Sequence, residues 1–517
     1  MSKKKISQRV YEYLFPQSKP APRRSYAAAR VDRTNMNWTT MPTSANYSQR
    51  ISLATLRARA RDASRNDPHL SKFLSLSRSN IIGPKGIQLQ ARARRANGKL
   101  NVTLNKRVEE AWWQWCHAET CTMSGKLDFK QVQDLCVTQL ECDGEFLIQL
   151  MPMADNAFGF SLKVWDVNWL DETYNEMLPN GNRVIMSVEV DRHYRPIAYW
   201  LTQPPVETYY AMDARRDRVR IPAAEMIHGF TVFDDESQIR GVSAFASVLL
   251  TAKDYAGYKR GVITSARVAA NSFGFVKQQL PDGEEWTGGE DENGEVQLPM
   301  IDSSPLSINL LNPGMEFQQF DPQQPTQNHA AFSKTILMEL AAGLGVPYFY
   351  LAGDMESVNF SSARVGLDDA REIWKGMQNF IANTLCRRVF NEWLMNAWAK
   401  GALTITAQEY REIRDPEWRA RGWKYIDPTK DIAADIERLK YRLATPSEIL
   451  GEQGIDYVDH LERWQADVEL AAGYGVDLEE IYADPKQIAA DEPPAKTDTN
   501  ATRGYLNGHD MDADILY

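Results

Sequence analysis

The pattern of hydrophobic and polar positions predicts a mixed first half and a helical second half. Residues 51–79 repeat apolar side chains at helical spacing, and the glycines of "IIGPKGIQLQAR" then introduce the alternation of a strand. "LNKRVEEAWWQWC" and "DFKQVQDLCVTQL" predict two more helices, and "EFLIQLMP" and "FSLKVWDV" predict two strands. The following stretch predicts a hairpin that turns at Asn180-Gly181 or at 192–195. Residues 51–240 therefore predict a mixed α+β domain.

Long helical segments dominate the rest of the chain. Residues 241–270 predict a helix of roughly 28 residues, about 42 Å long, whose many Ala, Ser and Gly side chains let another helix approach closely. Residues 271–325 predict a small β insert. Residues 326–346 predict a returning helix, which Gly345 and Pro347 end or kink.

Two further helical regions follow. Residues 363–400 predict a helix of up to about 37 residues, roughly 55 Å long, with one apolar face. The C-terminal part is also predicted to be helical, and one of its helices is expected to begin at Thr445 as N-cap with Glu448 at the third helical position.

A polar loop, "LAGDMESVNFSSARVGLDD" (351–369), separates two helical stretches. Within 353–362 the only charged side chains are Asp354 and Glu356. One chain gains little from a long helical hairpin with an Ala-rich face, but a ring of chains would bury such faces and direct the loop to the axis. A basic constriction would hold duplex DNA by its phosphates, whereas a nearly neutral, hydrated loop lets DNA slide. The pattern predicts a ring with a bore for DNA.

Charge is divided sharply along the chain. Residues 1–107 hold 23 Lys and Arg against 4 Asp and Glu, and the remainder holds 36 basic and 65 acidic residues. A basic N-terminal part predicts contact with a polyanion or an acidic neighbour, or a solvated arm without a partner. Seven acidic residues and no basic ones lie between Asp282 and Glu295. No segment reaches the roughly 18 consecutive apolar residues of a membrane helix.

The residue patterns that carry catalysis are missing from the sequence. It has no G-x-x-x-x-G-K-[ST] phosphate loop, no G-x-G-x-x-G after a strand, and no H-E-x-x-H or G-x-S-x-G motif. Only His228 lies where a site is expected, and a structural hydrogen bond is the favoured interpretation. Cys116, His117 and Cys121 fit no zinc spacing. The odd number of cysteines favours reduced, buried thiols in a cytosolic setting, and we expect no metal, no cofactor and no enzymatic activity.

Two other classes of protein remain open on the residues alone. The basic N-terminal third would suit a nuclease or translocase acting on nucleic acid, although the sequence offers neither a nucleotide loop nor a set of metal ligands. A helical scaffold that merely oligomerises would also explain the helices, but it would need no axial hole.

Four stretches, in their order and spacing, resemble the lambda-type portal proteins of tailed bacteriophages. They are "RNDPHLSKFLSLSRSNIIGPKGIQLQAR" (65–92), "EMIHGFTVFDDESQIRGVSAF" (225–245), "ELAAGLGVPYFYLAGD" (339–354) with the following "NFSSARVGLDDA", and "GWKYIDPTKDIAADIERLKYRLATPSEILGEQGID" (422–456). The resemblance implies a portal-type α+β fold and a ring, typically of twelve subunits, at one capsid vertex. Such a ring is the channel for genome packaging and ejection, takes part in procapsid assembly, and hydrolyses nothing.

The resemblance also divides the chain into regions. They are an N-terminal arm (1–50), an α/β wing (51–240), a first stem helix (241–270), a clip (271–325), a second stem helix (326–346), a channel loop (347–362), a long wing helix (363–400), C-terminal wing and crown helices (401–484) and a polar tail (485–517). The residues placed at the DNA channel are Asp354, Met355, Glu356, Ser357, Val358, Asn359, Phe360 and Ser361. Those placed at the docking surface of the clip are Asp282, Glu284, Glu285, Trp286, Glu290, Asp291 and Glu292.

The partners implied are other copies of the chain, double-stranded DNA in the channel, the major capsid protein and scaffold, the terminase large subunit, and head-completion, adaptor and tail proteins. The implied location is the portal vertex of the virion, after assembly in the host cytoplasm. The roles of the arm and the tail stay open, as does the choice between DNA and capsid as the neighbour of the basic part.

Overall fold

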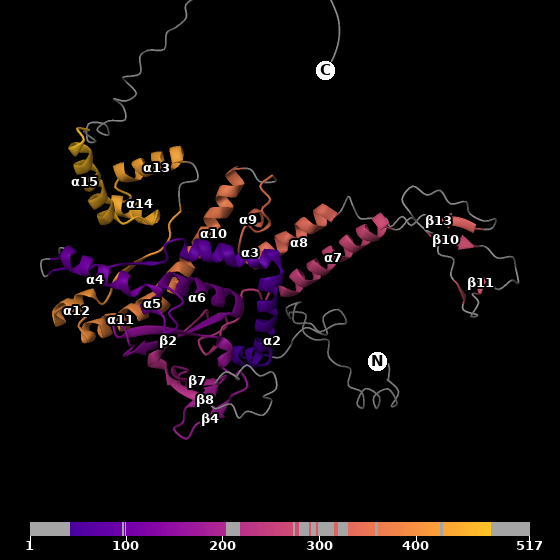
Figure 1. Cartoon of the computed structure of the whole chain (residues 1–517), viewed down its shortest axis with the longest axis horizontal. Coiled ribbons are helices and arrows are strands. Elements are labelled where there is room, and N and C mark those ends of the chain that lie inside the picture. Colours follow the sequence, from indigo (N-terminus) through magenta and orange to yellow (C-terminus); the bar gives the residue numbers. More distant parts are fainter. Residues whose placement is uncertain are drawn as a thin grey trace, which may run out of the picture. The chain divides into compact units, whose positions relative to one another are not determined.

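The computed structural model describes residues 42–95, 98, 100–202, 218–271, 275–278, 289–290, 296–297, 315–318, 329–356, 360–423 and 428–476. The chain forms two compact units, Met1–Ala420 (unit 1) and Arg421–Tyr517 (unit 2). It is a mixed α+β protein, mostly helical, with small antiparallel sheets (Figure 1). This confirms the predicted α+β class.

The first described helices are separated by a single residue, Asp67. Its carboxylate accepts hydrogen bonds from the backbone N–H groups of His69 (2.8 Å) and Leu70 (3.1 Å), and Pro68 takes the first position of the new helix. The continuous periodicity of 51–79 is therefore divided by a helix cap. The helices of this part are α2 (Ala45–Asn66), α3 (Pro68–Ser77), the π-helical turn η2 (Arg78–Ile82), α4 (Val102–Trp115), α5 (Ala118–Cys121) and α6 (Phe129–Asp143).

Two antiparallel sheets follow, one three-stranded (order β3-β2-β9) and one five-stranded (order β4-β5-β6-β7-β8). Leu147 and Met226 of the first pack with Val188 and Tyr199 of the second in one buried cluster. Both predicted turns exist, with positive φ at Gly181 and at Tyr194. The strands are β2 (Glu145–Pro152), β3 (Phe160–Trp165), β4 (Glu176–Met177), β5 (Arg183–Ile185), β6 (Val188–Val190), β7 (Pro196–Thr202), β8 (Arg218–Pro222) and β9 (Met226–Phe230).

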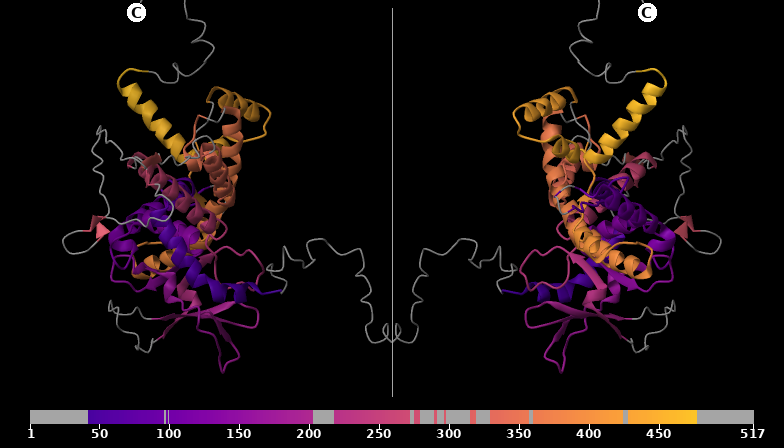
Figure 2. Two further views of the ribbon diagram at one scale, coloured as in Figure 1. Left: turned by 90° about the vertical axis from the view of Figure 1, so that its right-hand side faces the viewer. Right: turned by 90° about the vertical axis from the view of Figure 1, so that its left-hand side faces the viewer.

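Helices from both halves of the sequence pack on the three-stranded sheet. α6 packs against β2, and α11 (Arg387–Lys400) packs against β2 and β3 (Figures 1 and 2). Trp112 of α4 joins this layer, with its ring centroid 5.1 Å from that of Trp393 and 5.2 Å from that of Phe129. α11 continues α10 (Phe360–Ile381) through the π-helical turn η5 (Ala382–Cys386), so the long predicted helix is present and begins three residues earlier. The remaining elements here are α12 (Ala407–Ile413) and the pair β1 (Gln88–Gln90) with β14 (Glu417–Arg419).

The helix predicted to begin at residue 241 begins at Leu249, as α7 (Leu249–Asn271). The prediction of a helix was therefore wrong for residues 241–248. The carbonyl of Glu141 accepts hydrogen bonds from the Ser243 hydroxyl (3.2 Å) and the Ala244 N–H (3.0 Å). These long-range bonds replace the local bonds of a helix. A Cβ added to Gly241 would lie 2.0 Å from the carbonyl oxygen of Gly144, so this segment lies directly against the end of α6.

α7 and the returning helix α8 (His329–Gly343) lie side by side (Figure 1). Tyr258 and His329 join them through a 3.0 Å hydrogen bond. Between these helices the structure describes two strand pairs, β10 (Phe275–Gln278) with β13 (Met315–Gln318) and β11 (Gly289–Glu290) with β12 (Val296–Gln297).

Unit 2 consists of α13 (Pro428–Lys440), α14 (Pro446–Glu452) and α15 (Tyr457–Gly473) in its described part. The predicted start of α14 is confirmed: Thr445 caps the helix, and Glu448 completes the capping box. Of the described residues of this unit, only Ile449 and Asp456 are buried.

Candidate functional site

The loop that the sequence singled out is shorter than expected because helices enter it from both sides. After α8 the chain turns at Gly345 (φ +66°) and forms the short helix α9 (Tyr348–Ala352). Gly353, in the left-handed conformation, ends α9, and its N–H donates to the carbonyl of Phe349 (2.9 Å). Only 353–359 therefore separate α9 from α10.

Asp354 points back toward the helices. Its carboxylate accepts a hydrogen bond from the Tyr348 hydroxyl (3.2 Å), and the Lys334 ammonium lies 3.9 Å away. Burial raises the pKa of Tyr348, and the hydrogen bond to Asp354 and the charge of that carboxylate raise it further. The negative charge of Asp354 therefore lies against side chains of α8 and α9.

Met355 and Glu356 are the exposed side chains of the described loop. Met355 is 71% exposed. Phe360 and Ser361, expected in the loop, belong to the first turn of α10 instead. The remaining predicted channel residues, Ser357, Val358 and Asn359, lie outside the described residues.

The α7–α8 pair keeps large apolar side chains on its surface. Leu250 and Ile263 of α7 are 69% and 52% exposed, and Phe332 and Met338 of α8 are 49% and 46% exposed. Large apolar side chains that face solvent in a single copy are available for contact with another protein.

A buried cluster of charges fixes the segment that leads into α7, and sequence reasoning missed it. Glu145, at the start of β2, is fully buried. Arg240, Arg57 and His228 each place a side-chain nitrogen 2.9 Å from its carboxylate. Burial by itself would raise the pKa of Glu145, but the charge of Arg240 and the hydrogen bonds hold it well below its ordinary value. His228 therefore has the structural hydrogen bond that the sequence favoured. The signal available in sequence was a carboxylate at the head of an apolar strand.

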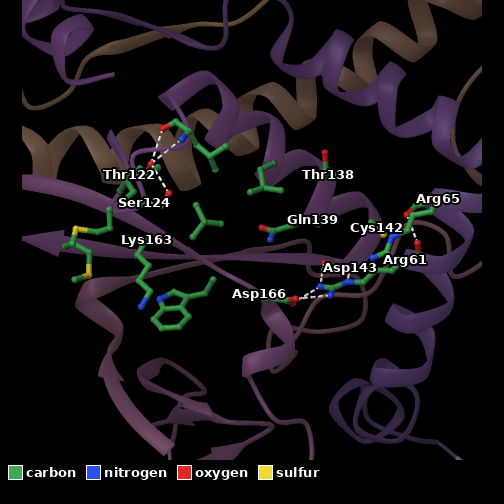
Figure 3. Close-up of a pocket in the computed structure, with 18 residues that line it drawn as sticks. Arg61, Arg65, Thr122, Ser124, Thr138, Gln139, Cys142, Asp143, Lys163 and Asp166 are labelled. Atoms are coloured by element: carbon green, nitrogen blue, oxygen red, sulfur yellow. Dashed lines mark hydrogen bonds and ion pairs between the residues drawn. The ribbon is translucent and has the colours of Figure 1, made fainter. Parts of the chain in front are cut away.

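A second charge cluster lies at the wall of a cavity of about 770 Å³ between α2, α6 and β3. Arg61 pairs with Asp143 (2.7 Å) and Asp166 (2.7 Å) at one end of it, and Thr122 and Ser124 lie at the other (Figure 3). Cys142 also lines the cavity, and burial raises the pKa of its thiol to about 11, so it is an unreactive thiol. No sequence pattern predicts this cavity.

The predicted docking residues of the clip lie mostly outside the described part. Glu290 belongs to β11, and the other six residues are not described. Among the residues that the structure describes, no group of three or more His, Cys, Asp or Glu side chains is arranged to hold a metal ion. Within the same residues, no helix is both long enough and apolar enough to span a membrane.

Comparison with known proteins identifies the family. The model of the phage portal proteins of the lambda family matches residues 31–378. A probable portal protein of Halomonas phage phiHAP-1 is 31% identical over 494 residues, which cover 92% of this chain and 94% of that protein. The portal protein of Escherichia phage N15 is 21% identical, covering 77% and 81% of the two chains, and portal protein B of Escherichia phage lambda is 22% identical, covering 45% and 48%.

Among solved structures, a chain from the neck of an empty GTA particle aligns with a TM-score of 0.41 at 12% identity, covering 82% of this chain and 98% of that one. The family match and the relative at 31% identity define a structural component of a virion. The chain belongs to the lambda family of phage portal proteins. Portal proteins are non-enzymatic, so the family excludes the nuclease or translocase, and the family implies an oligomeric ring.

Proposed function

We propose that copies of this chain, typically twelve, form a ring at one capsid vertex that serves as the channel for packaging and ejecting the genome. The observation that supports this most directly is the exposed apolar surface of α7 and α8. Leu250 and Phe332, for example, face solvent in a single copy. A ring would bury these side chains against neighbouring copies, and burial of apolar surface favours association.

The loop 353–359 would then border the bore. Its described exposed side chains are one flexible apolar group, Met355, and one carboxylate, Glu356. Neither attracts phosphate, so duplex DNA would slide past the loop. The hydrogen bond from Tyr348 to Asp354 would hold the first residues of the loop in place. We assign the lining of the channel to residues 354–361, as the sequence predicts.

We also assign the regions of a portal protein to this chain, using the bounds of its helices. Residues 51–248 would be the wing, α7 and α8 the stem, 272–328 the clip, and 360–400 the long wing helix, with the crown in unit 2. The acidic clip residues between Asp282 and Glu292 would dock the ATP-driven terminase and the connector proteins. Major capsid protein and scaffold would surround the wing, and assembly would take place in the host cytoplasm.

Electron microscopy of the purified protein tests the ring directly. Top views with an axial hole are expected, and a chain that stays monomeric at every concentration would overturn the proposal. Deleting 354–361 should leave rings intact but impair DNA packaging or retention. Rings that carry this deletion and still package and hold DNA normally would refute the role of the loop.

The docking role of the clip is tested separately, by reversing the charge of its acidic residues. Replacing the carboxylates at 282, 284 and 285 with Lys should weaken binding to the terminase or connector in a pull-down without changing the melting temperature. Substitution of three exposed carboxylates in unit 2 is the matched control. Unchanged binding would reject the docking role.

A further inference from the structure

We propose that neighbouring copies are joined by the insertion of Phe233 of one copy into the cavity between α2, α6 and β3 of the next. This proposal rests on the proposed ring, and it identifies the two different surfaces through which neighbouring copies in such a ring would touch. Both surfaces belong to unit 1, and neither takes part in the channel or the clip.

The segment after β9, "TVFDDES", presents an apolar tip. Phe233 is 72% exposed and Val232 is 52% exposed. The three residues that follow, Asp234, Asp235 and Glu236, are acidic and exposed. A large aromatic side chain in water beside three carboxylates is unfavourable in an isolated chain and typical of a contact site.

This tip is held in one conformation. The side-chain oxygen of Gln238, which is buried, accepts hydrogen bonds from the N–H groups of Phe233 (2.9 Å) and Asp234 (3.3 Å). The amide nitrogen of Gln238 donates to the carbonyl of Arg240 (2.8 Å). Asn46 of α2 donates to the carbonyl of Ser237 (2.7 Å). A preorganised tip loses little conformational freedom on binding, which favours affinity.

The cavity offers complementary chemistry. Its floor is apolar, with Leu162 and Val164 of β3 among its lining, and two exposed cations, Arg65 and Lys163, stand at its edge. Arg61 is already neutralised by Asp143 and Asp166. The ammonium of Lys163 lies over the ring of Trp165 (3.6 Å) and no carboxylate neutralises it among the contacts of the described residues, so we assign Arg65 and Lys163 to the acids beside Phe233. The volume of about 770 Å³ accommodates an aromatic side chain and its neighbours.

One polar atom of the cavity also lacks a partner. The Oε1 atom of Gln139 is buried and accepts no hydrogen bond within the described residues, and Gln139 lies in the middle of the cavity (Figure 3). Buried acceptors of this kind are nearly always satisfied. A donor of the entering segment other than the N–H groups of Phe233 and Asp234, which already bind Gln238, would satisfy it.

The two surfaces lie near opposite ends of α2. Asn46 contacts the tip, whereas Arg65 lines the cavity, and these positions are about 28 Å apart at 1.5 Å per residue. Phe233 therefore cannot fill the cavity of its own copy. A contact between two different surfaces of identical chains is heterologous, and it generates a ring when the rotation closes.

Engineered disulfides test the contact on the full-length chain. In a Cys142→Ala background, Asp234→Cys together with Ser124→Cys should give a ladder of covalent oligomers after mild oxidation of assembled rings. Either single variant should give no ladder, and co-assembly of the two single variants should give dimers only. Intact rings without any ladder would overturn the contact.

Charge exchange is the second test. Asp234→Lys with Glu236→Lys should raise the concentration needed for assembly about tenfold or more, as should Phe233→Ala, and adding Arg65→Glu with Lys163→Glu should restore assembly to the charge variant. Phe233→Ala rings that assemble normally and lose only another phage protein would contradict the contact. A wild-type chain that forms no ring would contradict the proposed function itself.

Discussion

Arg240 and Glu145 form an ion pair in which neither side chain is exposed to solvent. The Nε atom of Arg240 lies 2.9 Å from each carboxylate oxygen of Glu145, and the N–H of Gly241 donates to the same carboxylate (3.1 Å). Arg240 stands in the segment that leads into α7, and Glu145 begins β2. The pair therefore ties the segment that leads into α7 to the three-stranded sheet.

Removing one partner of this ion pair should lower the stability of the protein, because the other partner then stays buried without its counter-charge. Arg240→Met leaves Glu145 with fewer cations in a site without water, and we expect a loss of about 3–5 kcal/mol in the free energy of unfolding. Urea unfolding measures it. Arg240→Met combined with Glu145→Leu should regain part of the loss, because the unpaired carboxylate is gone and buried Arg57 keeps its ion pair with Glu172 (2.7 Å). Arg260→Met, on the exposed side of α7, is the control and should change stability by less than about 0.5 kcal/mol.

The close approach of Gly241 to Gly144 leads to a second prediction. A Cβ at Gly241 would lie 2.0 Å from the carbonyl oxygen of Gly144, whereas a Cβ at Gly257 of α7 meets no atom within 4 Å. Gly241→Ala should lower the melting temperature through a loss of about 1–3 kcal/mol. Gly257→Ala should raise stability by about 0.5–1 kcal/mol, since Ala favours a helix over Gly. Equal effects of the two variants would contradict the packing described for this junction.

Local patterns predicted much of this fold correctly. The strands β2 and β3, the turns at Gly181 and 192–195 and the capped start of α14 depend on alternation and on side chains within a few residues, which the sequence displays directly. The resemblance to the family was likewise read from the sequence, in four short stretches. The α+β class followed from the same periodicities.

Long-range pairing is what the sequence could not reveal. Residues 241–248 continue the run of small residues from which the helix was predicted, but the carbonyl of Glu141, about a hundred positions earlier, accepts hydrogen bonds from the Ser243 hydroxyl and the Ala244 N–H. The contact of Asp354 with Lys334 is also long-range, because Lys334 lies on a helix on the other side of the Gly345 turn. The cavity near Gln139 is built from α2, α6 and β3, and no local pattern encodes its volume.

Glu141 should make stability depend on pH. Burial raises the pKa of this carboxyl to about 7, above its value of about 4.3 in an unfolded chain. The folded state therefore holds the proton more tightly, so its stability is full below about pH 4 and falls as pH rises toward 7, by up to about 3 kcal/mol. Glu141→Gln should match the wild type at pH 4 and exceed it at pH 8 in urea unfolding. Glu110→Gln, at an exposed position of α4, should show no such difference, and a flat comparison for Glu141→Gln would refute the assignment.

The anchor of the channel loop can be tested without altering the loop itself. Tyr348→Phe removes the 3.2 Å hydrogen bond to Asp354 and leaves the aromatic ring, and Lys334 stays within 3.9 Å of the carboxylate. We expect faster amide hydrogen exchange at Gly353–Glu356, a loss of no more than about 1.5 kcal/mol in global stability, and unchanged ring formation. Tyr350→Phe is the matched control, because the ring of Tyr350 packs 6.1 Å from that of Trp374 and lies outside this contact. If both variants exchange at the wild-type rate, the hydrogen bond from Tyr348 does not hold the loop in place.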